Sequence, residues 1–343
     1  MISFKLLFAP LTAFQKIIKL MEIMEIFELS QTSKRMFACI KYAKRKIEPI
    51  RITKERFENT ICVVERKGER TGLTIHLEDW QANPIRFWKW DKFRLGVCVK
   101  QEEEKSFHCN YSKREDIDYH LTHCFNYLSD LFNNKTIAIW INRDLINESK
   151  WLFSNLNFEE CRYIRVKGHE APLTNDDMSN LLESLKPSFQ ISIECALDKR
   201  FSKKTILNLP RVTIWHAERI TYYDLLNMDC EVAEFENHQF SEEDVKKFIN
   251  HWLAGNNPKL IRLRLGNFES LPDWENILKG VEYEKWDGRR RPESYEISYT
   301  HHIEEVYCRN GLDFNRDDRT VGTLVHLFGS IEFIVWKNLE CRS

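Results

Sequence analysis

Apolar residues near the N-terminus recur at the spacing of short amphipathic helices. The first set follows Pro10 at intervals of three and four residues and comprises Leu11, Phe14, Ile17, Ile18 and Met21. The pattern restarts with a new phase at Ile23. Ser30, Thr32 and Ser33 then supply N-cap chemistry for a third helix. Short helices this rich in Leu, Ile, Phe and Met cannot bury their own apolar surface. We therefore expect a partner protein to cover residues 4–46.

The pattern changes to short strand-like runs between about residues 55 and 110. Residues 61–64, 73–77, 93–99 and 106–109 form these runs, which charged or turn-forming segments separate. Helical spacing returns over residues 116–132. The sequence thus predicts a strand-rich connecting region that leads into one longer helix.

A supersecondary unit repeats between about residues 137 and 280. Strands are predicted at 137–141, 162–166, 189–195, 211–215, 231–235 and 260–265. Helical segments between the later strands begin at the capping residues Thr174, Ser202, Thr221 and Ser241. In three of the four, an Asp stands three residues after the cap, at Asp177, Asp224 and Asp244. This spacing predicts capping boxes that start short helices.

Alternation of strands and capped helices every twenty to thirty residues predicts parallel strands joined by helical crossovers. The expected fold is mixed α+β and α/β, with a small all-α head followed by a leucine-rich-repeat-like α/β solenoid. Flanking strands at 295–299, 305–308, 320–327 and 331–336 would cap its open end. The consensus leucine-rich pattern with its Asn ladder is absent, so an ordinary α/β domain with short helices remains the alternative.

Composition narrows the class of protein. The 343 residues are 43% hydrophobic and 30% charged with a formal net charge of −1, which fits a soluble globular chain with no overall field that attracts nucleic acid. No apolar run reaches the roughly 18 residues needed to span a membrane, and Lys5 and Pro10 interrupt a signal-like start. The ten scattered cysteines form no CxxC pair. We expect buried free thiols in the cytoplasm or the nucleus.

No residue pattern indicates catalysis or a cofactor. The chain has no Gly-rich phosphate loop, no GxSxG and no HExxH. His120 and Cys124 share one helix face near His108, Cys109 and His123, but no second pair with zinc-like spacing follows, so packing explains them better than metal. The basic runs at 41–46 and 289–291 are expected to be solvated surface, because no nucleic-acid motif accompanies them.

Two groups of residues carry a resemblance to a known family. In the head, Phe4, Leu6, Leu7 and Pro10 precede Ile17, Ile18 and Leu29, and the stretch ends in Ser30, Ser33, Lys34 and Arg35. This order is similar to an F-box, in which Phe-Pro-Leu-Leu-Arg-Leu-Pro precedes a Leu/Ile-rich helix. Ala9 replaces the usual Leu before the proline, Lys5 stands where a Pro is common, and Glu22-Ile23 replaces the usual Asp-Pro.

The second group lies downstream and is more specific. Phe248, Trp252, Gly255, Asn257, Pro258 and Leu260 match a segment of the F-box-associated domain found in the large nematode-type F-box family. The segment at 221–230 matches another run of the same domain. The chain thus resembles a nematode-type F-box protein with a C-terminal F-box-associated domain.

The resemblance implies three regions and a non-catalytic role. Residues 1–48 would form the F-box-like helical domain, residues 49–136 the connecting region, and residues 137–343 the F-box-associated substrate-binding domain. An F-box docks on a Skp-type adaptor and, through it, on a cullin, which would make the chain the substrate-recognition subunit of an SCF-type ubiquitin ligase. The expected adaptor contacts are Leu6, Leu7, Pro10, Phe14, Ile17, Ile18 and Leu29. The alternative is a stand-alone repeat-type interaction module that does not engage the ligase. The target protein cannot be read from the sequence, and no cofactor, metal, nucleic acid or membrane is expected.

Overall fold

The chain forms two compact units. The computed structural model describes residues 10–57, 59–64, 73–78, 86–90, 93–101, 105–110, 117–286, 288, 290–299 and 303–337. The first unit comprises residues up to 164 together with 180–186, and the second comprises 165–179 and 187–343. The boundary falls within β8 (Glu160–Lys167) and α6 (Asn175–Ser184). The boundaries predicted at residues 48 and 136 both lie within the first unit, and the three predicted domains stay a prediction.

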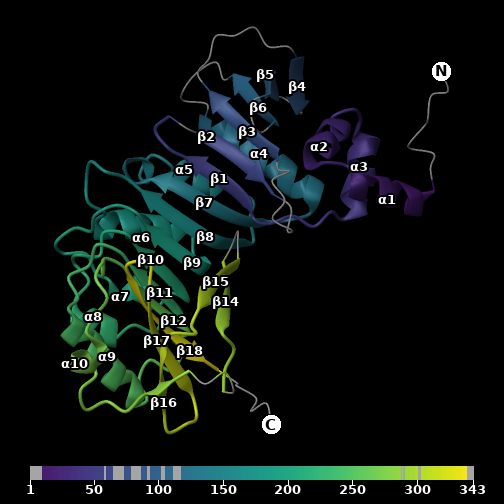
Figure 1. The fold of residues 1–343 in the computed structure, drawn as a ribbon. Helices are drawn as coiled ribbons and strands as arrows, with labels where there is room; N and C mark the ends of the chain where they lie inside the picture. The colour runs from purple at the N-terminus through teal and green to yellow at the C-terminus, as the bar shows by residue number, and fades with distance from the viewer. Residues whose placement is uncertain are drawn as a thin grey trace. The chain divides into compact units, whose positions relative to one another are not determined.

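Three helices form the N-terminal head of the first unit (Figure 1). They are α1 (Leu11–Leu20), α2 (Ile23–Ser30) and α3 (Lys34–Ala43). Of the three predicted capping residues, Ser33 starts helix α3, because its side chain accepts a hydrogen bond from the Met36 amide. Glu22 also serves as an N-cap, since its amide donates to the Glu25 carboxylate. The substitution of Asp-Pro by Glu22-Ile23 therefore keeps a device that starts α2.

A mixed sheet forms the remainder of the first unit. Its strands are β1 (Ile50–Lys54), β2 (Asn59–Val63), β3 (Leu73–Glu78), β4 (Arg86–Trp90), β5 (Phe93–Gln101), β6 (Lys105–Asn110) and β7 (Thr136–Asn142). They lie in the order β7-β1-β2-β3-β6-β5-β4, with β1 parallel to β7 and β3 parallel to β6. Helix α4 (Ile117–Phe132) packs against β1, β2 and β3, and η3 (Arg143–Leu145) and α5 (Lys150–Asn155) follow β7. The predicted strands and the predicted long helix of this region are confirmed.

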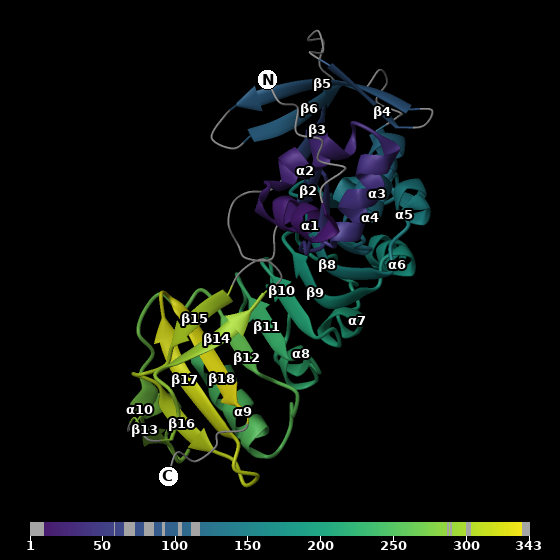
Figure 2. The same cartoon turned by 90° about the vertical axis from the view of Figure 1, so that its right-hand side faces the viewer.

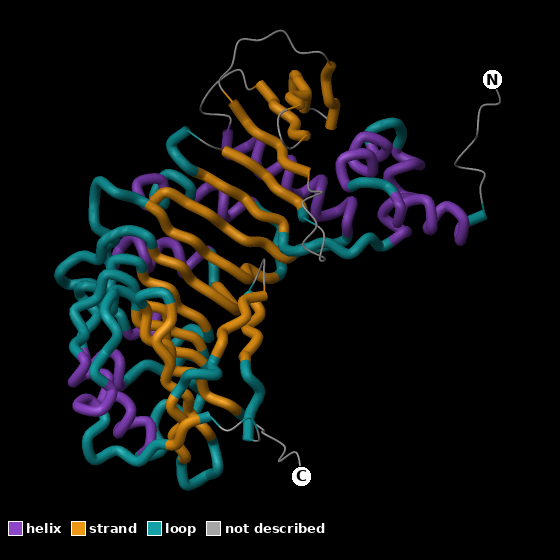
Figure 3. Tube along the Cα trace, in the orientation of Figure 1, coloured by secondary structure: helices purple, strands orange, loops and turns teal. Residues whose placement is uncertain are grey.

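Parallel strands joined by short helices build the first half of the second unit's sheet (Figure 3). Strands β9 (Pro187–Ile193), β10 (Arg211–Ile214), β11 (Val232–Phe235) and β12 (Arg262–Leu265) are parallel neighbours in that order. Helices α7 (Lys204–Leu207), α8 (Tyr222–Leu226) and α9 (Glu242–Leu253) connect them. Alternate residues such as Val212 and Ile214 are buried, while Arg211 and Thr213 are half-buried on the other face.

Capping boxes start α6, α8 and α9 at all three positions where the sequence predicted them. The amides of Asp177, Asp224 and Asp244 donate to the hydroxyls of Thr174, Thr221 and Ser241, and each Asp accepts from the amide of its cap residue in return. The fourth predicted capping residue, Ser202, does not cap its helix. Helix α7 begins at Lys204, and Lys203 stands at its N-cap in helical conformation with no side-chain bond. Ser202 has no carboxylate three residues later to complete a box, which explains the difference.

Antiparallel strands continue this sheet beyond β12. Strand β18 (Ser330–Trp336) pairs with β12, and β17 (Val321–Leu327), β16 (Leu312–Asn315) and β13 (Glu284–Lys285) follow in that order. A short helix, α10 (Trp274–Ile277), precedes β13. The strands expected at 320–327 and 331–336 are therefore confirmed, and they continue the sheet past β12.

A separate hairpin lies on the face of this sheet opposite α8 and α9 (Figures 1 and 2). It consists of β14 (Ser294–Ser298) and β15 (Ile303–Tyr307). Its apolar residues Ile297 and Val306 pack with Val321, Ile334 and Trp336 of the sheet. The hairpin therefore covers the β17–β18 part of this face.

Two asparagines join successive turns at the carboxyl ends of β11 and β12. Asn237 and Asn267 both adopt left-handed backbone conformations, at φ 48° and 59°. The Asn267 side-chain amide donates to Asn237 Oδ1 over 2.9 Å, and the Asn237 amide donates to the Trp215 carbonyl over 2.9 Å. A short asparagine ladder is therefore present, although the sequence pattern had indicated none. The observed architecture is a mixed α/β fold around large mixed sheets.

Candidate interaction surfaces

Part of the head's apolar surface is covered by the chain's own helix α4. Phe27 makes edge-to-face contacts with Trp88 and Tyr127, with ring centroids 4.8 and 5.8 Å apart. The Tyr127 hydroxyl lies 2.7 Å from the Ser30 hydroxyl, and Lys41 pairs with Asp130. Polar and aromatic contacts thus fix α2 and α3 against α4. The expectation that a partner protein covers the head does not hold for this side of it.

The predicted adaptor contacts divide into buried and accessible residues. Phe14 and Ile18 are 3% and 0% exposed, so they hold the head together. Pro10 is exposed, and Ile17 and Leu29 are half-buried. Leu6 and Leu7 lie outside the described residues. The sequence interpretation missed Leu20, which is 87% exposed.

An outward apolar stripe runs along α1. Ala13, Ile17 and Leu20 follow one another at intervals of four and three residues, on a different side of the helix from the buried pair Phe14 and Ile18. The sequence does contain a signal for this stripe. Helix α1 carries more apolar residues than one buried face can accommodate, so some of them must face outward. A single exposed Leu is common on protein surfaces and does not indicate a binding site. An apolar stripe of this kind, by contrast, can be buried in a groove of another protein.

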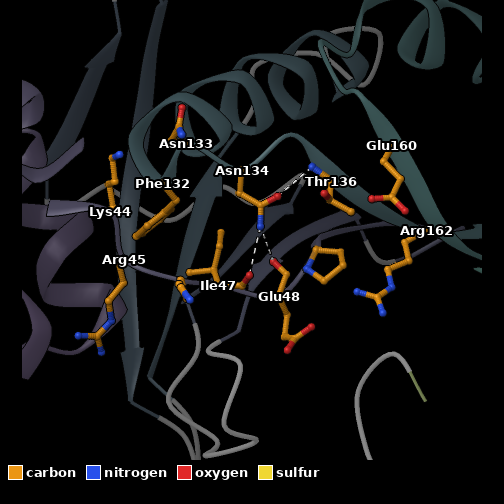
Figure 4. Close-up of a pocket in the computed structure, with 12 residues that line it drawn as sticks. Lys44, Arg45, Ile47, Glu48, Phe132, Asn133, Asn134, Thr136, Glu160 and Arg162 are labelled. Carbon is orange, nitrogen blue, oxygen red and sulfur yellow. Dashed lines mark hydrogen bonds between the residues drawn. The ribbon is translucent and has the colours of Figure 1, made fainter. Parts of the chain in front are cut away.

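A polar pocket lies in the first unit, which we call the basic pocket (Figure 4). It has a volume of about 370 Å³ and is lined by residues 44–49, 132–134, 136, 160 and 162. The Asn134 side-chain amide donates to the carbonyls of Ile47 and Glu48, over 3.2 and 3.3 Å, and its oxygen accepts from the Thr136 amide. Asn134 therefore fastens the segment after α3 to the turn between α4 and β7.

The residues that carry the downstream resemblance build the core and turns of the second unit. Trp252 is 0% exposed and packs edge-to-face on Phe333, with centroids 5.1 Å apart. Gly255 and Asn257 adopt φ values of 92° and 48°, which favour Gly and Asn. The Asn257 side-chain amide donates to the carbonyls of Leu226 and Met228. These bonds tie the turn after α9 to the end of α8 and the residues that follow it. Trp252, Gly255 and Asn257 therefore serve the fold.

A buried ionic cluster holds the β14–β15 hairpin on the sheet. Arg262 is 0% exposed and donates to both oxygens of Glu332 over 2.8 Å. It also donates to both oxygens of Glu304 on β15, over 2.7 and 2.9 Å, and to Glu234 on β11 over 3.3 Å. Although burial opposes ionisation, the bonds from Arg262 hold the pKa of Glu304 below its usual value. The Tyr299 hydroxyl donates to Glu234 and completes the network.

The described cysteines are free thiols, and most of them are buried. Burial raises the pKa of Cys161 and Cys230 to about 12, and burial in the presence of nearby charges does the same for Cys308. A thiol with such a pKa stays protonated at neutral pH and is a poor nucleophile. Among the side chains that the structure describes, no three His, Cys, Asp or Glu residues gather as a metal site. The side chains of His108 and Cys109 lie outside that set.

Thiol labelling at neutral pH is expected to separate these cysteines. Cys39 is partly exposed, so it should react with a maleimide well before Cys161, Cys230 and Cys308. Peptide mass mapping after a short exposure measures the order of modification. Rapid labelling of Cys230 in the native chain would contradict the buried position described above, whereas labelling of all three after urea addition is the positive control.

The helices give no indication of a membrane span. Within the described part of the chain, none combines the length and the apolar character that crossing a bilayer requires.

Comparisons with known proteins agree with the resemblance. Residues 200–265 match the family model described as F-box associated. An uncharacterized protein of Caenorhabditis elegans, F59B2.9, is 23% identical over 98% of this chain and 80% of its own length. A second C. elegans protein, F59B2.8, is 21% identical over 95% of this chain and 76% of its own length.

A third similarity is local. The C. elegans E3 ubiquitin-protein ligase hecw-1 is 28% identical over 30% of this chain, which corresponds to 8% of that protein. No solved structure is significantly similar to the chain. Residues 200–265 are thus similar to an F-box-associated segment, and nearly the whole chain is similar to two nematode proteins of comparable extent.

Proposed function

We propose that this chain is the substrate-recognition subunit of an SCF-type ubiquitin ligase. The observation that carries the proposal is the F-box-associated match at residues 200–265, which lies downstream of a three-helix head. In this proposal the head, near residues 1–48, is a degenerate F-box that docks on a Skp-type adaptor and, through it, on a cullin. The strand-rich region at 49–136 connects it to the substrate-binding domain at 137–343.

The outward stripe of α1 is the proposed adaptor contact. Ile17 and Leu20 would enter an apolar groove of the adaptor, with Pro10 and Leu29 at its border. Phe14 and Ile18 would support this stripe from inside the head. Leu6 and Leu7 stay in the proposal on the strength of the F-box resemblance alone.

The chain itself performs no chemistry in this proposal. The strand–helix units of residues 137–280 would act as a leucine-rich-repeat-like solenoid that holds a target protein. Fixing the target near a charged ubiquitin carrier raises the rate through effective concentration, with no acid, base or nucleophile from this chain. This role places the protein in the cytoplasm or the nucleus, where such ligases operate.

The proposal is tested by comparing adaptor binding of the wild-type chain with that of the variant Leu20→Asp. We expect the full chain to bind a purified nematode Skp-type adaptor at micromolar concentration, and Leu20→Asp to weaken binding about 10- to 100-fold, because burial of a Leu contributes about 1.5–3 kcal/mol. Isothermal titration calorimetry measures both. Since Leu20 is exposed in the free chain, the variant should keep its circular dichroism spectrum and melting temperature.

The matched control is Tyr223→Asp, which changes another exposed large side chain, 75% accessible against 87% for Leu20, in the second unit. It should bind the adaptor like the wild type. Failure of the wild-type chain to bind any Skp-type adaptor at micromolar concentration would remove the ligase role.

A stand-alone interaction module is the second candidate. The contacts of Phe27 and Ser30 with the chain's own Trp88 and Tyr127 favour it, because they satisfy part of the head without a partner. Under this alternative, Leu20→Asp changes no adaptor interaction, and target binding by the full chain persists without any ubiquitin transfer.

A further inference from the structure

We propose that the basic pocket binds an anionic side chain carried by an extended peptide segment of another protein. Anion binding by this pocket does not depend on the ligase role. Only the identification of that peptide as part of a ligase target rests on the proposed function.

The first argument is the charge of the lining. Four basic side chains, Lys44, Arg45, Lys46 and Arg162, line the pocket together with two acidic ones, Glu48 and Glu160. In the part of the chain that the structure describes, the ammonium groups of Lys44 and Lys46 make no ion pair or hydrogen bond. Both lysines are exposed. An incoming anion would therefore gain two charge-assisted hydrogen bonds without breaking any existing ones.

The second argument is that the backbone around these lysines is fixed before a ligand arrives. Lys44 ends α3 in a left-handed conformation at φ 52°, which turns the chain sharply before Lys46. Arg45 donates to the carbonyls of Ile18, over 3.1 Å, and Lys19 at the end of α1. The Glu48 amide donates to the Val64 carbonyl over 2.9 Å. A site held in this way loses little conformational entropy on binding.

The third argument concerns the kind of ligand that fits. The pocket also has apolar walls, which the buried residues Ile47, Pro49 and Phe132 form. Figure 4 shows Lys44 and Arg45 on one side of Asn134, with Glu160 and Arg162 on the other. A cavity of about 370 Å³ is large enough for one or two side chains, and its mixture of apolar and charged walls suits a peptide.

Nucleic acid is the less favoured ligand. The chain has a formal net charge of −1, and the two carboxylates at the pocket would repel a continuous phosphate backbone. A peptide can present a single anionic group, which matches the local cluster of basic side chains at the pocket. The anionic group is either a phosphate on Ser or the carboxylate of Asp or Glu, since both accept hydrogen bonds from lysine.

Fluorescence anisotropy with three labelled degenerate peptide pools tests the proposal on the full chain. The pools share random flanking positions and carry phosphoserine, glutamate or serine at the fixed centre. We expect the phosphoserine pool, the glutamate pool or both to bind, and the serine pool to bind at least about tenfold more weakly. Inorganic phosphate should compete with the bound pool. Preference for phosphoserine identifies phosphate as the source, and equal binding identifies any acidic side chain.

Charge reversal locates the site. Lys44→Glu combined with Lys46→Glu should lower affinity for the anionic pools by at least about tenfold. Lys204→Glu is the matched control, because Lys204 is an exposed lysine on α7 in the second unit. Circular dichroism should show both variants folded, since all three side chains are exposed.

Three results would overturn the proposal. They are equal binding of all three pools, an unchanged affinity of the double variant, and tighter binding of a single-stranded RNA 12-mer than of any peptide pool. None of these bears on adaptor binding, which depends on α1. If the wild-type chain binds the adaptor but no anionic peptide pool, the pocket proposal is contradicted and the ligase role is unaffected. If it binds an anionic peptide pool but no adaptor, the ligase role is contradicted and the pocket proposal is unaffected.

Discussion

Arg262→Met is expected to destabilise the second unit by about 3–5 kcal/mol, because it removes one partner of a buried ionic cluster. The substitution leaves the carboxylates of Glu234, Glu304 and Glu332 facing one another. Glu332 keeps a second cation nearby, since Arg264 Nε lies 3.4 Å from it, but Arg264 pairs with Glu236 as well. Unpaired buried carboxylates carry a large desolvation penalty that the arginine now offsets. Equilibrium urea unfolding followed by far-ultraviolet circular dichroism measures the change.

Two further variants make this prediction specific. Arg290→Met breaks an exposed pair with Glu284 and should cost less than about 1 kcal/mol. Adding Glu234→Leu, Glu304→Leu and Glu332→Leu to Arg262→Met should recover much of the loss, because apolar replacement of a whole buried ionic cluster is often neutral or stabilising. A destabilisation by Arg262→Met no larger than that of Arg290→Met would show that the cluster contributes little.

Trp252→Ala is expected to cost about 3–5 kcal/mol, the range found when a buried aromatic side chain is truncated. The indole of Trp252 is enclosed by Phe333 on β18 and by the Arg316 guanidinium, which lies 5.0 Å from the ring. The space is closely packed: a Cβ atom at Gly322 would lie 2.5 Å from the Phe333 ring and 3.0 Å from the Trp252 ring. Neighbours so tightly placed cannot collapse fully into the cavity.

Trp215→Ala serves as the comparison for Trp252. It removes the same side chain in the same unit, but Trp215 is about half exposed. Its loss should cost at most about 1 kcal/mol, and the same urea experiment measures it. Similar midpoints for the two variants would mean that the family motif around Trp252 has a role other than packing.

Local features were predictable from the sequence because neighbouring residues determine them. The capping boxes at Thr221 and Ser241 need only a hydroxyl and a carboxylate three residues apart. The helices of the head follow from apolar spacing, and Ser33 caps α3 as predicted. Ser202 failed because a capping residue alone, without a partner at the third position, is a weak signal.

Features that depend on distant residues were not predictable. Arg262 meets Glu304 and Glu332 only because β15 crosses the sheet and β18 pairs with β12, and no spacing in the sequence indicates these contacts. The basic pocket likewise combines residues 44–49 with residues near 134 and 160. The run at 41–46 was interpreted as solvated surface, since charge alone does not show whether a cavity lies beside it. The ladder between Asn237 and Asn267 has a detectable signal in the sequence, namely an Asn two residues after the end of each strand.

The position of β18 between β12 and β17 has a consequence for biosynthesis. During translation β12 emerges first, and its edge stays unpaired until all of β13 to β17 and then β18 have left the ribosome. Over that interval the ring of Trp252 also lacks Phe333, its partner on β18. The nascent second unit therefore exposes a strand edge and an aromatic surface, two features that make a folding intermediate prone to aggregation until β18 pairs with β12.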